Sequence, residues 1–183
     1  MLIRKERESE FDAIHAFIIE AFKTSETPDD TVQDYVRAIR ENPSKYEPEL
    51  ALVAEIDGKI IGYIMSMKSY VETPSGRVEG MLAVAPLAVD LELRKQGIGR
   101  KLMNEMQRIA AELGYKGAFL AGNPDYYTRL GYTPSYEYDI IYEDEALSKA
   151  IYELTGRELR NCIMAYELSD GALDGVSGKI ALI

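Results

Sequence analysis

The sequence is poor in the residues on which several common catalytic and metal sites depend. Among 183 residues it has one cysteine, Cys162, and one histidine, His15. A single cysteine excludes a disulfide within the chain and any metal site built from several cysteines. A zinc hydrolase site or a nucleophile–histidine triad would need His15, which has no flanking motif of that kind. We interpret His15, at the edge of an apolar helix stripe, as structural and Cys162, in an apolar stretch, as a core residue.

Positive charge is also scarce. The chain has 21 Lys and Arg against 31 Asp and Glu, a net charge of -10. A groove that binds DNA or RNA needs a surplus of cations to displace the counterions condensed on the nucleic acid. We therefore expect no nucleic-acid partner.

Long hydrophobic runs are missing. The longest apolar run, Met81–Val89, has nine residues, whereas a membrane-spanning helix needs about 20. The first ten residues, MLIRKERESE, are charged from the fourth onward, where a secretory signal would carry an apolar segment. We expect a cytoplasmic protein that does not enter the membrane.

The length and the hydrophobic patterning predict one mixed α/β domain. A domain averages roughly 150 residues, so 183 residues favour a single domain over residues 1–183. Alternating and continuous apolar segments predict strands at Leu2–Arg7, Leu50–Ile56, Lys59–Tyr70, Val78–Val89, Ala118–Ala121, Tyr136–Tyr142 and Cys162–Leu168. Helical spacing predicts a helix at Phe11–Phe22 and a second helix that starts at Asp29 or Asp30 and ends at Asn42. A third predicted helix carries Leu102, Met106, Ile109 and Leu113 on one face. A fourth spans Glu145–Leu154, and Tyr126–Leu130 form a helical turn. The order of these elements is not the regular alternation of a doubly wound fold, so we expect one central mixed sheet.

The segment Val78–Val89 is the most informative strand. Its nearly continuous apolar character is typical of a central strand covered on both faces. It contains Pro86, and proline cannot donate a hydrogen bond to a neighbouring strand. Either the strand bulges there and parts from a neighbour, which leaves backbone groups free to meet a ligand, or Pro86 occupies an edge position.

A glycine-containing loop follows this strand. It reads Arg94-Lys95-Gln96-Gly97-Ile98-Gly99-Arg100 and precedes an amphipathic helix. Glycines and the first N–H groups of a helix can together bind a phosphate. A P-loop is excluded because the chain has no Gly-x-x-x-x-Gly-Lys-Ser/Thr run, and a dinucleotide fingerprint is excluded because its third glycine position is Leu102. The alternative is a loop that only connects strand and helix.

Two segments resemble motifs of one enzyme family. Residues 87–90 with 94–102 resemble the acyl-CoA motif of the GNAT (GCN5-related N-acetyltransferase) superfamily, and residues 123–132 resemble its later Tyr-x-x-x-Gly-Phe motif, with Tyr132 in place of the usual Phe. The C-terminal residues are similar to a bacterial subfamily of predicted N-acetyltransferases. The resemblance implies a single GNAT-like domain, α/β or α+β. Its mostly antiparallel mixed sheet would have about seven strands, flanked by about four helices and split between the two central strands.

The resemblance also implies where acetyl-CoA, the co-substrate, would bind; it implies no metal. The implied cofactor residues are Leu87, Ala88, Val89, Arg94, Lys95, Gln96, Gly97, Ile98, Gly99, Arg100, Asn123 and Tyr127. Backbone N–H groups of residues 96–100 would hold the pyrophosphate. The local cations, Lys101 among them, suit an anionic ligand, although they could also form a solvated helix face. Asn123 either binds the pantetheine arm or caps the turn before Pro124.

Three residues are candidates for catalysis. By the resemblance, Tyr127 protonates the leaving thiolate, the backbone at Leu87 polarises the thioester carbonyl, and Glu79 acts as the general base for the amine. The alternatives are that Tyr127 only packs among the chain's 13 tyrosines, that Glu79 is a surface residue, and that a water replaces it as the base.

These observations predict an N-acetyltransferase that uses acetyl-CoA. The acetyl group would pass directly to a primary amine of an unidentified small molecule or protein. A CoA-binding regulatory or sensor module without turnover is the alternative from another class, and a nucleotide-binding protein using the same loop is a third. The sequence leaves open whether the chain is a monomer or a homodimer.

Overall fold

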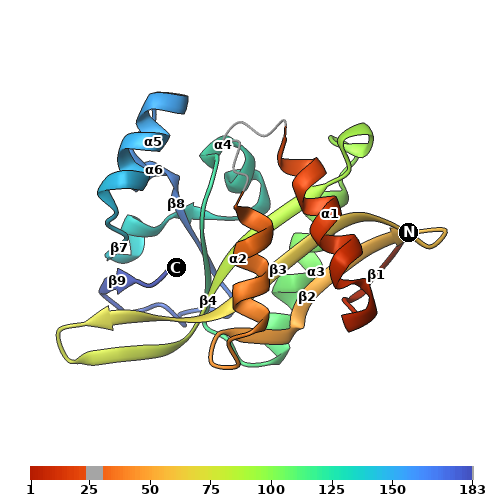
Figure 1. Ribbon diagram of the computed structural model, residues 1–183. Helices are drawn as coiled ribbons and strands as arrows, with labels where there is room; N and C mark the ends of the chain where they lie inside the picture. Colours follow the sequence, from red (N-terminus) through yellow and green to blue (C-terminus); the bar gives the residue numbers. More distant parts are fainter. Residues whose placement is uncertain (24–30, 183) are drawn as a thin grey trace. The chain divides into compact units, whose positions relative to one another are not determined.

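The structure is a computed structural model that describes residues 1–23 and 31–182 (Figure 1). The chain forms two compact units, each made of two stretches: residues 1–67 with 84–109, and residues 68–83 with 110–183. The strands β3, Lys59–Thr73, and β4, Gly76–Val89, pass from one unit to the other, as does the helix α3, Ile98–Glu112. The predicted mixed α/β class is confirmed.

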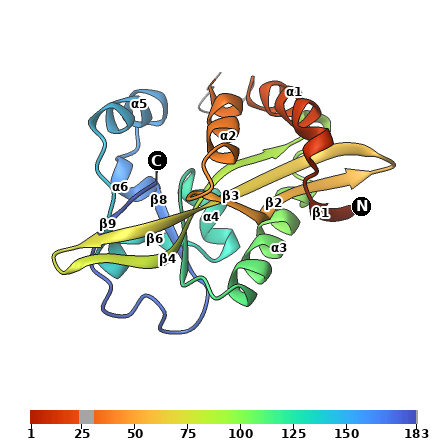
Figure 2. The same ribbon diagram turned by 60° about the horizontal axis from the view of Figure 1, so that its bottom comes forward.

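The first unit is a sheet covered by helices on both faces. Strands β1, Leu2–Lys5, and β2, Tyr46–Ile56, pair antiparallel, and β2 pairs antiparallel with β3. Asp57 and Gly58 form the turn between β2 and β3, with φ angles of 50° and 79°, as a two-residue hairpin turn requires. Helices α1, Phe11–Phe22, and α2, Val32–Arg40, lie on one face of this sheet and α3 lies on the other (Figure 2).

Strand alternation explains why each face of β3 meets a different helix. Side chains of successive strand residues point to opposite faces. Tyr63 bonds Arg40 of α2 at 3.3 Å, whereas a Cβ at the neighbouring Gly62 would lie 2.9 Å from Leu102 of α3. Gly62 therefore lets α3 approach the sheet closely.

The periodic apolar positions of the helices form the core of the first unit, as predicted. Fully or almost fully buried are Ile14, Ile18 and Ala21 of α1, Val36 and Ile39 of α2, and Leu102, Met103 and Met106 of α3. One position of the predicted stripe is wrong: Leu113 is 48 % exposed, because α3 ends one residue earlier, at Glu112.

The second unit is built around the C-terminal part of β3, residues 68–73, and the N-terminal part of β4, residues 76–83. Met81–Ala83 of β4 pair in parallel with Gly117–Phe119 of β5, which spans Gly117–Ala121. The remaining strands of this unit are β6, Thr133–Pro134, β7, Ile140–Ile141, β8, Ile163–Glu167, and β9, Gly178–Ile180. Strand β8 pairs antiparallel with β5 and β6, and β9 pairs with β3 and β7. The helices here are α4, Pro124–Tyr127, α5, Glu145–Thr155, and α6, Leu159–Cys162.

The pairing of the two central strands is short, as the predicted split between them requires. The register between β4 and β5 covers three residue pairs and ends at Ala83 and Phe119. Strand β4 continues to Val89 in the first unit and β5 continues to Ala121 in the second.

The described residues hold nine strands and six α-helices, more than the seven and four predicted. The predicted strand Tyr136–Tyr142 is wrong: Ser135–Tyr138 form a 3-10 turn, and the left-handed Asp139, with a φ of 56°, precedes the two residues of β7. Cys162 closes α6 rather than opening β8. The predicted start of the second helix, Asp29 or Asp30, lies outside the described residues.

No helix within residues 1–23 and 31–182 has the length and apolar character that crossing a membrane requires.

Candidate functional site

The last part of β4 belongs to the first unit and carries the residues expected to hold the pantetheine arm. Along it, Pro86 and Ala88 are buried while Leu87 and Val89 are partly exposed. The Ala85–Pro86 peptide bond is cis. The structure thus places Pro86 inside the strand, and the bulge at this position stays a prediction.

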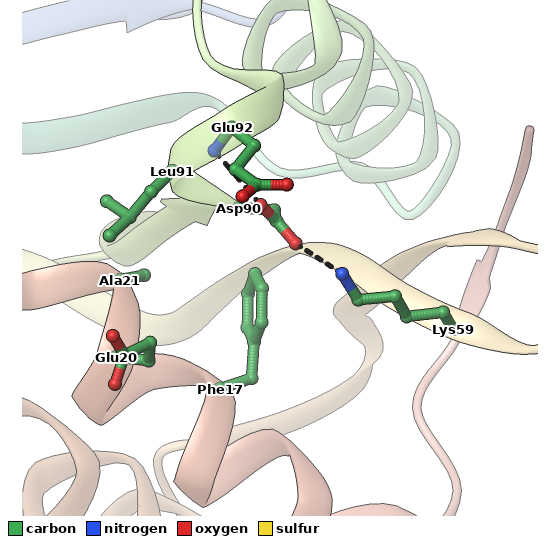
Figure 3. A pocket seen from close by; sticks show the side chains of 7 residues that line it. All are labelled: Phe17, Glu20, Ala21, Lys59, Asp90, Leu91 and Glu92. Carbon is green, nitrogen blue, oxygen red and sulfur yellow. Dashed lines mark hydrogen bonds and ion pairs between the residues drawn. The ribbon is translucent and has the colours of Figure 1, made fainter.

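Asp90 fixes the turn that leads from β4 into the glycine loop. Its N–H donates to the Ile61 carbonyl at 2.9 Å, and its carboxylate accepts from the Glu92 N–H at 3.1 Å and from Lys59 Nζ at 2.8 Å (Figure 3). The hydrogen bond from Lys59 lowers the pKa of the Asp90 carboxyl. Asp90 is therefore a fixed anion that anchors the start of the loop.

The glycine loop leads into the start of α3, where the first backbone N–H groups have no acceptor within the helix. Gly97 has a φ of 84° with open space around its Cβ position, so its conformation rather than crowding favours glycine. The first intrahelical bond runs from the Lys101 N–H to the Gly97 carbonyl at 3.1 Å. The N–H groups of Ile98, Gly99 and Arg100 precede this bond, and helix geometry gives such groups no intrahelical acceptor. Together with the positive end of the helix dipole they form an arrangement that suits a phosphate.

The four predicted cations of the loop differ in their surroundings. Arg94 is half-buried and donates from Nη2 to the Ala21 carbonyl at 2.5 Å, which ties the loop to the last turn of α1. Lys95, Arg100 and Lys101 are exposed. The tether joins residues 73 positions apart, and nothing in the local sequence indicates it.

A pocket of about 280 Å³ opens beside Asp90 in the first unit. Its lining residues are Phe17, Glu20, Ala21, Lys59, Asp90, Leu91 and Glu92 (Figure 3). Three of them are carboxylates, and the one ammonium group, on Lys59, already bonds Asp90. Because like charges close together repel, these carboxylates make the pocket a poor binding site for a pyrophosphate. The helix start remains the better anion site. The sequence did not predict the pocket.

The second unit carries the later motif on a short helical turn. The Asn123 side chain accepts from the Asp125 N–H at 3.0 Å and so caps α4, with Pro124 at the first helical position. The capping role of Asn123 is confirmed; its contact with a ligand stays a prediction. Gly131, with a φ of 87°, ends the turn.

Tyr127 lies among aromatic rings on this turn. Its ring centroid is 5.0 Å from that of Tyr126 and 5.7 Å from that of Tyr132, both in edge-to-face geometry. Burial of the Tyr127 phenol raises its pKa well above the ordinary value, and the neighbouring Tyr126 adds to the effect. The phenol therefore keeps its proton at neutral pH and is available as a donor, while its raised pKa makes it a weaker acid than an ordinary tyrosine.

The other candidates are spread over the two units. Glu79 is exposed in the first half of β4. His15 is half-buried on α1. Cys162 is buried, as predicted, and burial raises the pKa of its thiol. In the described part of the chain, no three His, Cys, Asp or Glu side chains gather as a metal site would need.

Known proteins with related sequences and structures share one family. A model of the acetyltransferase (GNAT) domain matches residues 2–135. The uncharacterized N-acetyltransferase YhbS of Escherichia coli K12 is 29% identical over 181 residues, which cover 98% of this chain and 95% of YhbS.

Solved structures agree with this assignment. The crystal structure of Escherichia coli YhbS in complex with CoA has a TM-score of 0.79 at 28% identity, covering 98% of this chain and 87% of that one. A GNAT family acetyltransferase from Brucella melitensis, crystallised with acetyl-CoA, has the same fold with a TM-score of 0.73 at 23% identity, covering 98% and 94%. The glycine loop, the early pairing end between β4 and β5 and the Tyr127 turn thus occur in a chain that belongs to the acetyltransferase (GNAT) domain family.

Proposed function

We propose that this acyltransferase acts as a single catalytic domain that moves the acetyl group of acetyl-CoA directly onto a primary amine of a small molecule or a protein. The observation that carries the proposal is the start of α3, where the N–H groups of Ile98, Gly99 and Arg100 have no intrahelical acceptor and three exposed cations stand nearby. That the relative YhbS was crystallised with CoA supports the same ligand here.

Each segment of the motif binds a different part of acetyl-CoA. Backbone N–H groups of residues 96–100 hold the pyrophosphate, with Lys95 and Arg100 adding charge, while Arg94 keeps the loop in place through Ala21. The backbone of residues 87–89 and the Asn123 side chain bind the pantetheine arm. The N–H of Leu87 polarises the thioester carbonyl; loss of such a donor costs about 3–4 kcal/mol of transition-state stabilisation.

The transfer needs one bond formed, one broken and two proton movements. The neutral amine nitrogen attacks the thioester carbon, the C–N bond forms, and the tetrahedral oxyanion collapses with cleavage of the C–S bond. The leaving thiolate takes its proton from the Tyr127 hydroxyl. The amine proton passes to Glu79 or to a water. Because a thiol pKa of about 8.5 already makes the thiolate a tolerable leaving group, protonation by Tyr127 contributes at the low end of the usual ~10²–10⁴-fold range.

Calorimetric titration of the protein with acetyl-CoA tests the ligand. We expect binding in the micromolar range for acetyl-CoA and CoA and none for ATP. Replacing both Lys95 and Arg100 with Ala should weaken binding, whereas the control Lys149→Ala, an exposed lysine of α5, should leave it unchanged. Absence of heat with acetyl-CoA, or equal binding of ATP, would contradict the proposal.

Turnover is tested with the Tyr127→Phe variant and a panel of primary amines, with release of the CoA thiol as the readout. An enzyme should release thiol with at least one amine class and slow in the variant while still binding acetyl-CoA. Binding without thiol release for every amine would instead assign the chain to the class of CoA sensors.

A further inference from the structure

Gly122, the residue that follows β5, lies directly against the Tyr127 ring. A Cβ at this position would overlap Tyr127 Cε2 and lie 2.9 Å from Tyr127 Cδ2 and 3.2 Å from Leu120 Cδ1. The φ of Gly122 lies outside the left-handed region, so the backbone conformation itself does not require glycine. The Tyr127 ring is therefore the main reason why this position has no room for a side chain.

The backbone of Gly122 is held in place from the C-terminal part of the chain. Its N–H donates to the Cys162 carbonyl at 2.9 Å, which extends the antiparallel pairing that places Ala121 opposite Ile163. Gly122 thus continues the β5–β8 ladder by one residue and presents a fixed, flat surface.

Two further tyrosine rings contact the Tyr127 ring. Tyr126 and Tyr132 meet it edge to face, and Tyr132 in turn lies 5.3 Å from the Tyr166 ring of β8. The ring can yield to a new methyl group at residue 122 only by turning about its own side-chain bonds or by lifting the α4 turn. Rotation about the Cα–Cβ bond or lifting of the turn displaces the phenol oxygen. Rotation about the Cβ–Cγ axis, on which that oxygen lies, does not displace it, but the edge-to-face rings of Tyr126 and Tyr132 oppose this rotation.

We propose that Gly122 is a positioning residue for acetyl transfer: its missing side chain lets the Tyr127 ring lie against the end of β5, and the Cys162 carbonyl holds it there. The inference rests on the proposed function, in which Tyr127 protonates the leaving thiolate. It adds a residue that acts through Tyr127 without contacting the reacting atoms.

A kinetic double-mutant cycle tests the catalytic side. We expect Gly122→Ala to lower kcat by about tenfold or more, toward the Tyr127→Phe value, since a displaced general acid loses most of its contribution. The KM for the acceptor amine should stay within about twofold, because binding that is equal in ground and transition states is untouched. On the Tyr127→Phe background, Gly122→Ala should cause no further loss of kcat. Multiplicative losses would overturn the proposal.

A second double-mutant cycle, measured as the change in Tm, tests the contact between Gly122 and Tyr127 independently of catalysis. Gly122→Ala should lower Tm in the wild-type chain but leave it nearly unchanged on the Tyr127→Ala background, where the ring is gone. Equal Tm losses on both backgrounds would mean that Gly122 does not seat the ring, whatever the kinetics show.

Gly117→Ala is the matched control, because Gly117 begins the strand that Gly122 follows and also has no room for a Cβ. Its added Cβ would lie 2.9 Å from Leu173 Cδ2 and 3.1 Å from Phe119 Cε2. We expect this variant to lose stability and to keep kcat below its melting range. A similar fall in kcat for Gly117→Ala would show general loosening of the unit and overturn the proposal.

The Tyr127→Phe variant separates the two levels of inference. If it slows transfer and Gly122→Ala does not, only the positioning role of Gly122 is wrong. If Tyr127→Phe keeps full kcat while acetyl-CoA still binds and reacts, the proton-donor role is wrong, and the positioning role falls with it.

Discussion

At the scale of single residues, the first unit depends on one buried carboxylate. The Glu6 side chain is 2% exposed and bonded by Arg40, 9% exposed. The Tyr46 and Tyr63 hydroxyls also donate to it, at 2.9 and 2.8 Å. Arg40 reaches both carboxylate oxygens and lies 3.9 Å from the Phe11 ring centroid. A buried charge is tolerated only when it is paired and hydrogen-bonded in this way.

We expect Arg40→Met to lower the free energy of unfolding by about 3–5 kcal/mol, because Glu6 then stays buried without a cation. Tyr63→Phe should cost less, about 1.5–3 kcal/mol, for one hydrogen bond to a charged group. Urea unfolding measures both. Lys5→Met, which breaks the exposed pair with Glu49, is the control and should cost at most about 1 kcal/mol. An equal loss in Arg40→Met and Lys5→Met would show that the network does not stabilise the unit.

Also at this scale, the raised pKa of Tyr127 predicts the form of the pH–rate profile. A phenol that donates a proton is active while neutral, and burial keeps it neutral above its ordinary pKa of about 10. We expect kcat to show no fall between pH 8 and about 10 in the wild-type enzyme, measured by thiol release. A falling limb in that range that is absent from Tyr127→Phe would mean that the phenol loses its proton too early, contrary to the pKa direction.

At the residue scale, the sequence predicts the local features of the site but not its long-range contacts. Gly97, Gly131 and the Asn123 cap are visible because turn and cap chemistry depends on neighbours within a few positions. The Arg94 tether to Ala21 and the Arg40–Glu6 pair join positions 73 and 34 residues apart. No spacing rule connects such partners, so only the folded chain shows them.

At the scale of elements, the attachment of β9 depends on Gly178. A Cβ there would overlap the Glu72 carbonyl oxygen of β3 and lie 2.9 Å from its carbon, and backbone cannot swing aside. We expect Gly178→Ala to cost about 1–3 kcal/mol and to speed hydrogen exchange of the Ala181 N–H, which donates to the Tyr70 carbonyl at 3.1 Å.

The control for Gly178 is Gly175→Ala. Gly175 has a φ of 71° and nothing within 4 Å of its Cβ position, so alanine there meets only backbone strain of about 1–2 kcal/mol. Exchange at Ala181 should then stay slow. Fast exchange in both variants would mean that β9 is held by something other than its fit against β3.

The length of an element and the periodicity of its buried residues decide whether the sequence predicts it. Helices α1 and α3 are long, and their buried positions recur at helical spacing, so the pattern alone identifies them. Strands β7 and β9 have two and three residues, too few for any alternation to appear. Strand β9 pairs with both β7 and β3, and a local stretch of sequence does not show pairing between distant parts of the chain.

At the scale of the whole molecule, ligand binding should stabilise the chain by mass action. A ligand at 100 times its Kd adds about 2.7 kcal/mol to the stability of the folded state. For a chain of this size each kcal/mol raises Tm by about 2–4 °C. We therefore expect saturating acetyl-CoA to raise Tm by about 5–11 °C, measured by scanning calorimetry, and ATP at equal concentration to leave Tm unchanged.

The salt dependence of the Tm shift caused by acetyl-CoA indicates which charges of the protein act on the bound ligand. The chain carries a net charge of -10, yet at about 0.15 M salt the screening length is about 8 Å, so distant carboxylates hardly repel an anionic ligand. In the proposed site, the exposed Lys95 and Arg100 lie within this length of the ligand and attract it. Added salt should therefore weaken binding and reduce the Tm shift, and replacing both residues with Ala should remove most of this dependence. A Tm shift that grows with salt would mean that the overall negative charge dominates and that the loop cations do not contact the ligand.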